Sequence, residues 1–115
     1  MTSAFPKKDW SGAPRRAALS PAQLVGALTK LEAWQLTGSG DQIAIEKAFS
    51  FANYFQTMAF VNAVAFIAHA TDHHPDLQVH YSRCVVRLST HDAKGVTQTD
   101  LECAAKIDAL LAAPT

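Results

Sequence analysis

The feature that most constrains the fold is a long apolar run that stops at two histidines and a proline. Residues 55–70 are apolar at most positions, and His73, His74 and Pro75 follow shortly after them. Proline cannot continue a helix, and it disfavours helical angles at the residue before it. The sequence therefore predicts a helix over residues 53–71 that is packed on more than one side and ends at the histidine pair.

Short strands flank this central helix on both sides, in pairs. They are expected over residues 34–36, 43–51, 78–81 and 83–90. The turn-forming residues 37–41 join the first pair into a hairpin, and Ser82 lies between the members of the second pair. In the last strand Cys84, Val86 and Leu88 are expected to share one apolar face, opposite Arg83, Val85 and Arg87.

Two shorter amphipathic helices open and close the patterned part of the chain. Ser20 suits a helix N-cap and Pro21 the first helical position, with leucines recurring at helical spacing after them. Near the other end, Thr97 and Asp100 resemble a capping box in which Asp replaces the usual Glu or Gln. A last helix is expected to follow them.

The predicted order of elements is α-β-β-α-β-β-α. No helix separates the members of either strand pair, so both pairs are expected to be antiparallel. We therefore predict an α+β two-layer sandwich, a four-stranded antiparallel sheet with three helices on one face. A length of 115 residues suits one domain, expected over residues 17–115. Residues 1–16 have no periodic pattern and are expected to form a mobile N-terminal arm.

Composition excludes several classes of function and leaves room for self-association. The net charge is zero, which argues against nucleic-acid binding through a broad basic patch. Charged residues make up only 17% of the chain, so a subunit interface is compatible with the composition. No secretory signal or membrane-spanning run is recognised, and Cys84 and Cys103 fit no zinc or disulfide pattern. A cytoplasmic protein that does not bind membranes is expected.

Histidines are the side chains best suited to carry chemistry. They occur at positions 69, 73, 74, 80 and 91. A hairpin that starts beside His74 should return His91 to the same place. Three uses compete for this group: acid–base catalysis, a metal site and structural capping of a helix end. A structural role is favoured for a single histidine, no common metal-ligand spacing is met, and the grouping of three rings favours catalysis.

Several stretches together resemble one known family, the pterin-4a-carbinolamine dehydratases. They are His73-His74-Pro75-Asp76, Val79-His80-Tyr81 and residues 88–97 (LSTHDAKGVT), preceded by Leu19-Ser20, Trp34 and Phe49-Ser50-Phe51. The resemblance covers about residues 17–112. It departs from the family at His69, where some members have an acidic residue, and at Leu77, where many have an aromatic one.

The resemblance implies an activity and a set of site residues. Members dehydrate 4a-hydroxytetrahydropterin to the quinonoid dihydropterin, in recycling of the tetrahydrobiopterin cofactor of aromatic amino-acid hydroxylases. They use no metal and no cofactor, since the pterin is the substrate, and they form homodimers or homotetramers. By motif, the catalytic residues are His73, His74 and His91. The residues expected to bind substrate are Trp34, Pro75, Ser89, Thr90 and Asp92.

The chemistry implied by the resemblance suits imidazole side chains. Loss of the 4a-hydroxyl as water needs a proton on oxygen, and loss of the N5 proton completes the double bond. His74 is expected to hold and orient the pterin, while His73 and His91 share the acid and base roles in an order that the sequence leaves open. The alternative is a non-catalytic binding or assembly module on the same fold, such as a transcriptional coactivator or an assembly chaperone.

Overall fold

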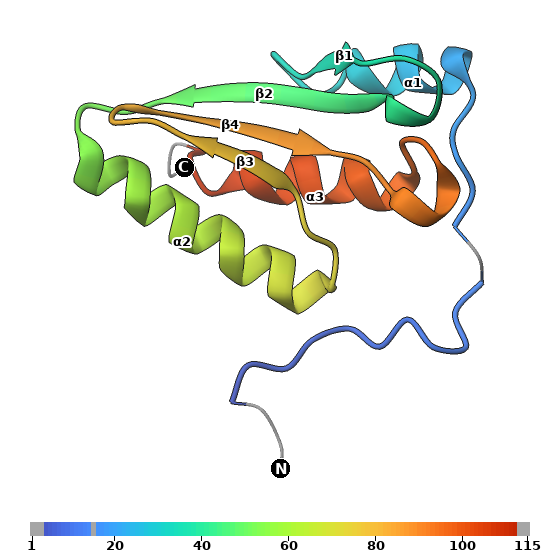
Figure 1. The fold of residues 1–115 in the computed structure, drawn as a ribbon, viewed down its shortest axis with the longest axis horizontal. Coiled ribbons are helices and arrows are strands. Elements are labelled where there is room, and N and C mark those ends of the chain that lie inside the picture. Colours follow the sequence, from blue (N-terminus) through green and yellow to red (C-terminus); the bar gives the residue numbers. More distant parts are fainter. Residues whose placement is uncertain (1–3, 15, 113–115) are drawn as a thin grey trace.

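The computed structural model describes residues 4–14 and 16–112, and its centre is a four-stranded antiparallel sheet (Figure 1). In chain order the elements are α1 (Pro21–Leu28), β1 (Gln35–Thr37), the 3-10 turn η1 (Gly40–Gln42), β2 (Ala44–Ser50), α2 (Tyr54–Thr71), β3 (Asp76–Val79), β4 (Arg83–Leu88), the 3-10 turn η2 (His91–Ala93) and α3 (Gln98–Ala109). The predicted α+β class and order of helices and strands are confirmed.

The strands lie side by side in the order β1-β2-β4-β3. The central pair has the longest register, from Ile45 opposite Leu88 to Ser50 opposite Arg83. The last strand is shorter than predicted, because Thr90 leaves the sheet and forms an isolated bridge with Gly95. This bridge closes the loop that contains η2.

The core lies between the sheet and the helices that cover one of its faces, α2 and α3 (Figure 1). Cys84, Val86 and Leu88 are completely buried, as their alternation predicted. The same apolar cluster takes in side chains from every helix, including Leu24 of α1, Phe60 of α2 and Ile107 of α3. Burying each large apolar side chain contributes about 1.5–3 kcal/mol, so this cluster is the main support of the site.

The first two helices, α1 and α2, begin at local capping contacts. The Ser20 hydroxyl accepts a hydrogen bond from the Gln23 backbone N–H at 3.2 Å. In return, the Ser20 backbone N–H donates to Oε1 of the Gln23 side chain at 2.8 Å. The Asn53 side chain accepts from the Gln56 N–H at 2.9 Å at the start of α2. These contacts satisfy N–H groups that a helix leaves unpaired at its start.

No helix in the described part of the chain is long and apolar enough to cross a membrane.

A polar contact inside the helical layer links α3 to the sheet. The two oxygens of the Asp108 carboxylate accept separately from Lys47 Nζ at 2.8 Å and from Trp34 Nε1 at 3.0 Å. Lys47 belongs to the otherwise apolar face of β2, and this ion pair explains how that face accommodates a charge.

The described part of the arm lies against the C-terminal end of α2 (Figure 1). The Lys8 N–H donates to the Ala70 carbonyl at 2.8 Å, and Trp10 Nε1 donates to the Thr71 carbonyl at 2.9 Å. The last carbonyls of a helix lack partners within the helix, so the arm supplies donors where they are needed. These contacts show where the arm rests, while its predicted mobility stays a prediction.

Candidate functional site

A polar cavity of about 210 Å³ lies where the end of α2 meets the segment after β4. Three parts of the chain build it: the turn after α2, the loop around η2 and Arg16 at the end of the N-terminal arm. All eight lining residues carry polar side chains: Arg16, Asp72, His73, His74, Ser89, Thr90, His91 and Asp92. Groups of this kind donate and accept protons, and we call the cavity the histidine pocket.

The turn at the end of α2 sends its two histidines in different directions. Asp72 adopts a left-handed conformation, with φ 48° and ψ 47°, which ends the helix. The His73 N–H then donates back to the Ala68 carbonyl at 3.1 Å. As a result His73 is buried, with 7% of its surface exposed, whereas His74 is exposed. Neighbouring residues therefore offer one fixed ring and one accessible ring.

Both ring nitrogens of His73 have partners. Nε2 lies 2.5 Å from Asp100 Oδ1, and Nδ1 lies 3.0 Å from Arg16 Nη1. A guanidinium only donates hydrogen bonds, so Nδ1 must accept the bond from Arg16. The ring consequently carries its proton on Nε2 and donates it to Asp100. The carboxylate thus orients the imidazole so that its basic nitrogen is Nδ1, which in this structure accepts from Arg16.

Asp100 is completely buried at the start of α3, and its second oxygen is also occupied. Oδ2 accepts from the Thr97 N–H and from the Thr90 hydroxyl, each at 2.8 Å. A buried carboxylate requires such donors, because burial without them is very unfavourable. The predicted capping contact between Thr97 and Asp100 is present. Asp100 thus joins the start of α3, the end of β4 and His73.

The structure brings the three predicted catalytic residues together around one cavity. His91 is exposed and starts η2, and His74 also lines an adjoining cavity of about 220 Å³ that includes Pro75 and His69. The catalytic roles of His73, His74 and His91 stay predictions. Within residues 4–14 and 16–112, no group of three or more His, Cys, Asp or Glu side chains is arranged to hold a metal ion.

The residues predicted to bind substrate are not all in the histidine pocket. Ser89, Thr90 and Asp92 line it, although the Thr90 hydroxyl is already bound to Asp100. Pro75 lines the adjoining cavity. Trp34 lies in the core with 4% of its surface exposed and donates to Asp108, so its position gives no support to a substrate contact within this chain.

Sequence reasoning missed three residues around the site: Asp72, which lines the pocket beside His73, Arg16 and Asp100. Arg16 was assigned to the arm, yet its side chain reaches His73. Asp100 was interpreted only as a helix cap, yet it also binds the imidazole. Asp100 is the third residue of a helix that follows a predicted site loop, and this position was a signal that its carboxylate could reach the site. For Arg16 the sequence contains no comparable signal.

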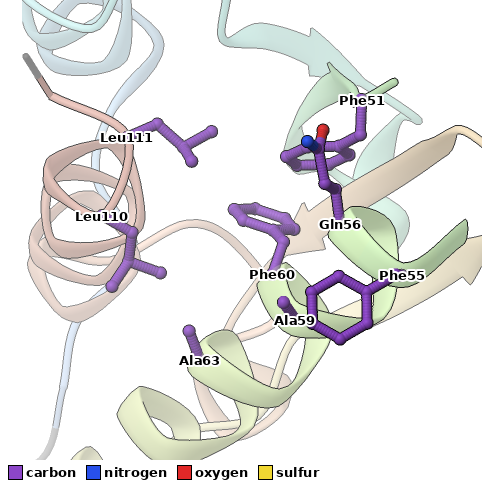
Figure 2. Close-up of a pocket in the computed structure, with 8 residues that line it drawn as sticks. All are labelled: Phe51, Phe55, Gln56, Ala59, Phe60, Ala63, Leu110 and Leu111. Atoms are coloured by element: carbon purple, nitrogen blue, oxygen red, sulfur yellow. The ribbon is translucent and has the colours of Figure 1, made fainter. Parts of the chain in front are cut away.

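A second, larger cavity of about 370 Å³ lies at the other end of α2 (Figure 2). Seven of its eight lining residues are apolar, and Figure 2 shows them on α2, on the segment before it and at the end of α3: Phe51, Phe55, Gln56, Ala59, Phe60, Ala63, Leu110 and Leu111. Phe55 is 80% exposed. We call this cavity the apolar hollow. Exposed apolar surface of this kind is typical of association sites.

Comparison with known proteins places the whole patterned region in one family. The family model for pterin 4 alpha carbinolamine dehydratase matches residues 17–110. A protein of Paracidovorax citrulli (strain AAC00-1), named "Putative pterin-4-alpha-carbinolamine dehydratase", is 63% identical over 112 residues, 97% of this chain and 96% of the relative. A protein of the same name from Bdellovibrio bacteriovorus is 50% identical over 97 residues, 81% of this chain and 78% of the relative.

Two solved structures share the fold. One is a crystal structure described as a transcriptional coactivator/pterin dehydratase from Brucella melitensis, with a TM-score of 0.77 and 32% identity over 83% of this chain and 99% of that one. The other is a pterin dehydratase-like protein identified as a RuBisCO assembly factor in the alpha-carboxysome, with a TM-score of 0.62 and 25% identity over 72% of this chain and 94% of that one. On this evidence the chain belongs to the pterin-4a-carbinolamine dehydratase family.

Proposed function

We propose that the protein dehydrates a pterin 4a-carbinolamine to the quinonoid dihydropterin. The observation that carries this proposal is the grouping of His73, His74 and His91 around one polar cavity, in a chain of this family. The cavity offers imidazoles in two settings, one held by a buried carboxylate and two accessible. Acid–base catalysis of a dehydration needs a proton donor and a proton acceptor at once.

The geometry favours His73 as the base and His91 as the acid. Asp100 holds the Nε2 proton of His73, which directs the Nδ1 lone pair toward the side of Arg16 and the cavity. In the proposed reaction, protonated His91 gives a proton to the 4a-hydroxyl oxygen, and the C4a–O bond breaks with its electron pair leaving in water. The N5 proton passes to His73 Nδ1, and the N–H electron pair forms the C4a–N5 double bond. Solvent then returns the proton from His73 to His91.

His74 has the position expected of a group that orients the substrate. It is exposed, it lines both the histidine pocket and the adjoining cavity, and Pro75 fixes the backbone after it. A planar pterin that extended from one cavity into the other would pass this ring. Ser89 and Asp92 add polar groups for the edge of the pterin. The physiological role that we propose is recycling of a tetrahydropterin cofactor for an aromatic amino-acid hydroxylase.

The first experiment is a rate measurement. Purified protein is added to freshly generated 4a-hydroxytetrahydropterin, and formation of the dihydropterin is followed by absorbance, with His74→Ala measured in parallel. Acceleration by the wild type and its loss in the variant would support the enzyme. A folded wild type that does not accelerate the reaction would contradict the proposal.

A second candidate function, assembly with protein, is favoured by the apolar hollow. Three of the side chains that line it are exposed to solvent in the single chain, Phe55 by 80%, Leu110 by 40% and Leu111 by 52%. We propose that a second copy of the chain covers it in a homodimer or homotetramer. A different protein partner is the alternative, and mass measurement of the purified protein by light scattering distinguishes a homo-oligomer from a monomer that awaits such a partner.

A further inference from the structure

The contact between Arg16 and His73 conflicts with the role proposed for His73. A neutral imidazole has one lone pair, and here Nδ1 uses it to accept from Arg16 Nη1 at 3.0 Å. A nitrogen that accepts this bond cannot take the N5 proton of a substrate at the same time. Either His73 is not the base, or Arg16 leaves Nδ1 when the substrate binds.

We propose that Arg16 is a positioning residue that holds His73 in its base form in the free protein and gives up Nδ1 to the substrate. This inference rests on the proposed dehydration and adds a residue that lies just outside the region matched by the family model, residues 17–110. A second proton on Nδ1 would end the contact with Arg16 and bring two positive groups together. Arg16 therefore keeps the ring neutral and its proton on Nε2.

The contacts that hold Arg16 are individually weak, so a substrate can displace it. Its guanidinium lies over the Trp10 ring, 4.4 Å from the ring centroid, and 3.9 Å from the Asp92 carboxylate, whose side chain is 85% exposed. A cation–π contact at such a site contributes about 0.5–1 kcal/mol, and an exposed ion pair contributes little. Trp10 itself is anchored more firmly, because Nε1 donates to the Thr71 and Asp72 carbonyls. Arg16 can move while the arm stays in place.

The charged and titratable groups around His73 come from four elements. Arg16 comes from the arm, Asp100 from α3, and the remaining groups are Asp72 and His74 beside it and His91 and Asp92 in the loop after β4. Arg16 opposes a second proton on the ring, whereas Asp100 favours it. Removal of Arg16 alone should therefore leave Nδ1 without a partner while Asp100 still holds the Nε2 proton.

Arg16→Met tests both halves of the proposal. The kcat/KM of dehydration on its pH plateau should rise, by about tenfold if the displaced bond has the strength usual for a hydrogen bond to a charged group. Arg16→Lys retains a donor for Nδ1 and should restore most of the wild-type kcat/KM. Lys8→Met is the matched control, since Lys8 also lies over Trp10 but has its contact there and not with His73.

Imidazole NMR tests the contact without any activity. In the free wild type, long-range ¹H–¹⁵N spectra should show His73 with its proton on Nε2 at neutral pH, and Arg16→Met should shift the Nδ1 signal, because Nδ1 loses its donor. An unchanged His73 spectrum in the variant would overturn the contact. A plateau kcat/KM that falls, or does not change, would overturn the displacement. If the wild type accelerates no dehydration, the proposed function fails, and the spectra still decide whether Arg16 holds the ring.

Discussion

The two cavities lie at opposite ends of the same pair of helices and differ completely in polarity. The C-terminal end of α2 and the start of α3 contribute to the histidine pocket, whereas the first turns of α2 and the end of α3 line the apolar hollow. The helices therefore run antiparallel. The end where the arm binds the last carbonyls of α2 groups histidines around a buried carboxylate, and the other end exposes apolar side chains. The catalysis and the association that we propose can therefore be tested separately.

The largest expected effect is the loss of dehydration when a histidine of the pocket is replaced, with no change at the apolar hollow. His91→Ala and His74→Ala should each lower the dehydration rate by about 100-fold or more, the usual contribution of a positioned acid or base. Neither ring belongs to the hollow, so sedimentation should not change. His80→Ala, at an exposed position after β3, serves as the control. Near-normal turnover in both pocket variants would show that the polar end is not catalytic.

Asp100→Asn should disturb both the pocket and the fold. One carboxylate oxygen becomes an amide N–H that faces existing donors, and an unsatisfied buried donor costs about 1–3 kcal/mol. Urea unfolding should show a loss of that order, together with reduced turnover because His73 loses its orientation. Asp41→Asn, at an exposed position in η1, should change stability by less than about 0.5 kcal/mol. Wild-type stability in Asp100→Asn would remove Asp100 from this central role.

Phe55→Ser changes the apolar hollow and leaves the histidine pocket intact. Because the ring is largely exposed in the single chain, folding should hardly change, whereas the subunit contact should weaken by about tenfold or more in dissociation constant, typical of a buried aromatic in an interface. Analytical ultracentrifugation over a range of concentrations measures this, with turnover expected within about twofold of wild type. Val25→Ser, also exposed but on α1, is the control. Equal sedimentation of all three proteins would show that the hollow is not an interface between copies.

The smallest effect concerns the buried thiols between the two ends. Burial raises the pKa of both Cys84 and Cys103, so the folded protein favours the unreactive thiol. The resulting stabilisation is fully present below the pKa of an unfolded cysteine and is lost as the pH rises through the raised pKa. Labelling by a thiol reagent near pH 8 should therefore be slow until the protein opens. Cys103 Sγ lies 3.8 Å from Thr71 Oγ1, so its labelling reports separation of α3 from α2. Asp100→Asn should accelerate it and Phe55→Ser should not.

Local signals predicted most of the fold. The caps at Ser20 and at Thr97 and Asp100, and the alternation from Cys84 to Leu88, act over a few residues, and the structure contains them close to where the sequence places them. The return of His91 toward the histidine pair was also predictable, because a hairpin of two short strands leaves few other positions for its end.

Contacts between distant segments were not predictable in the same way. The Trp34–Asp108 bond joins residues 74 positions apart, and no periodic pattern indicates it. The resemblance to the family led to the prediction that Trp34 binds substrate, whereas in the structure its side chain packs in the core. The contact of Arg16 with His73 depends on how the arm folds back along α2, and that path is set by carbonyl groups that every helix has at its end.

The triple attachment of Asp100 has a consequence for protein engineering. One side chain starts a helix, closes a loop and orients a ring, so selection for a new substrate cannot alter it without also selecting against folded protein. Libraries aimed at other bicyclic carbinolamines should therefore keep Asp100, Thr97 and Thr90 constant. Diversity belongs at Ser89 and Asp92, which border the same space and for which the described structure shows no comparable buried network.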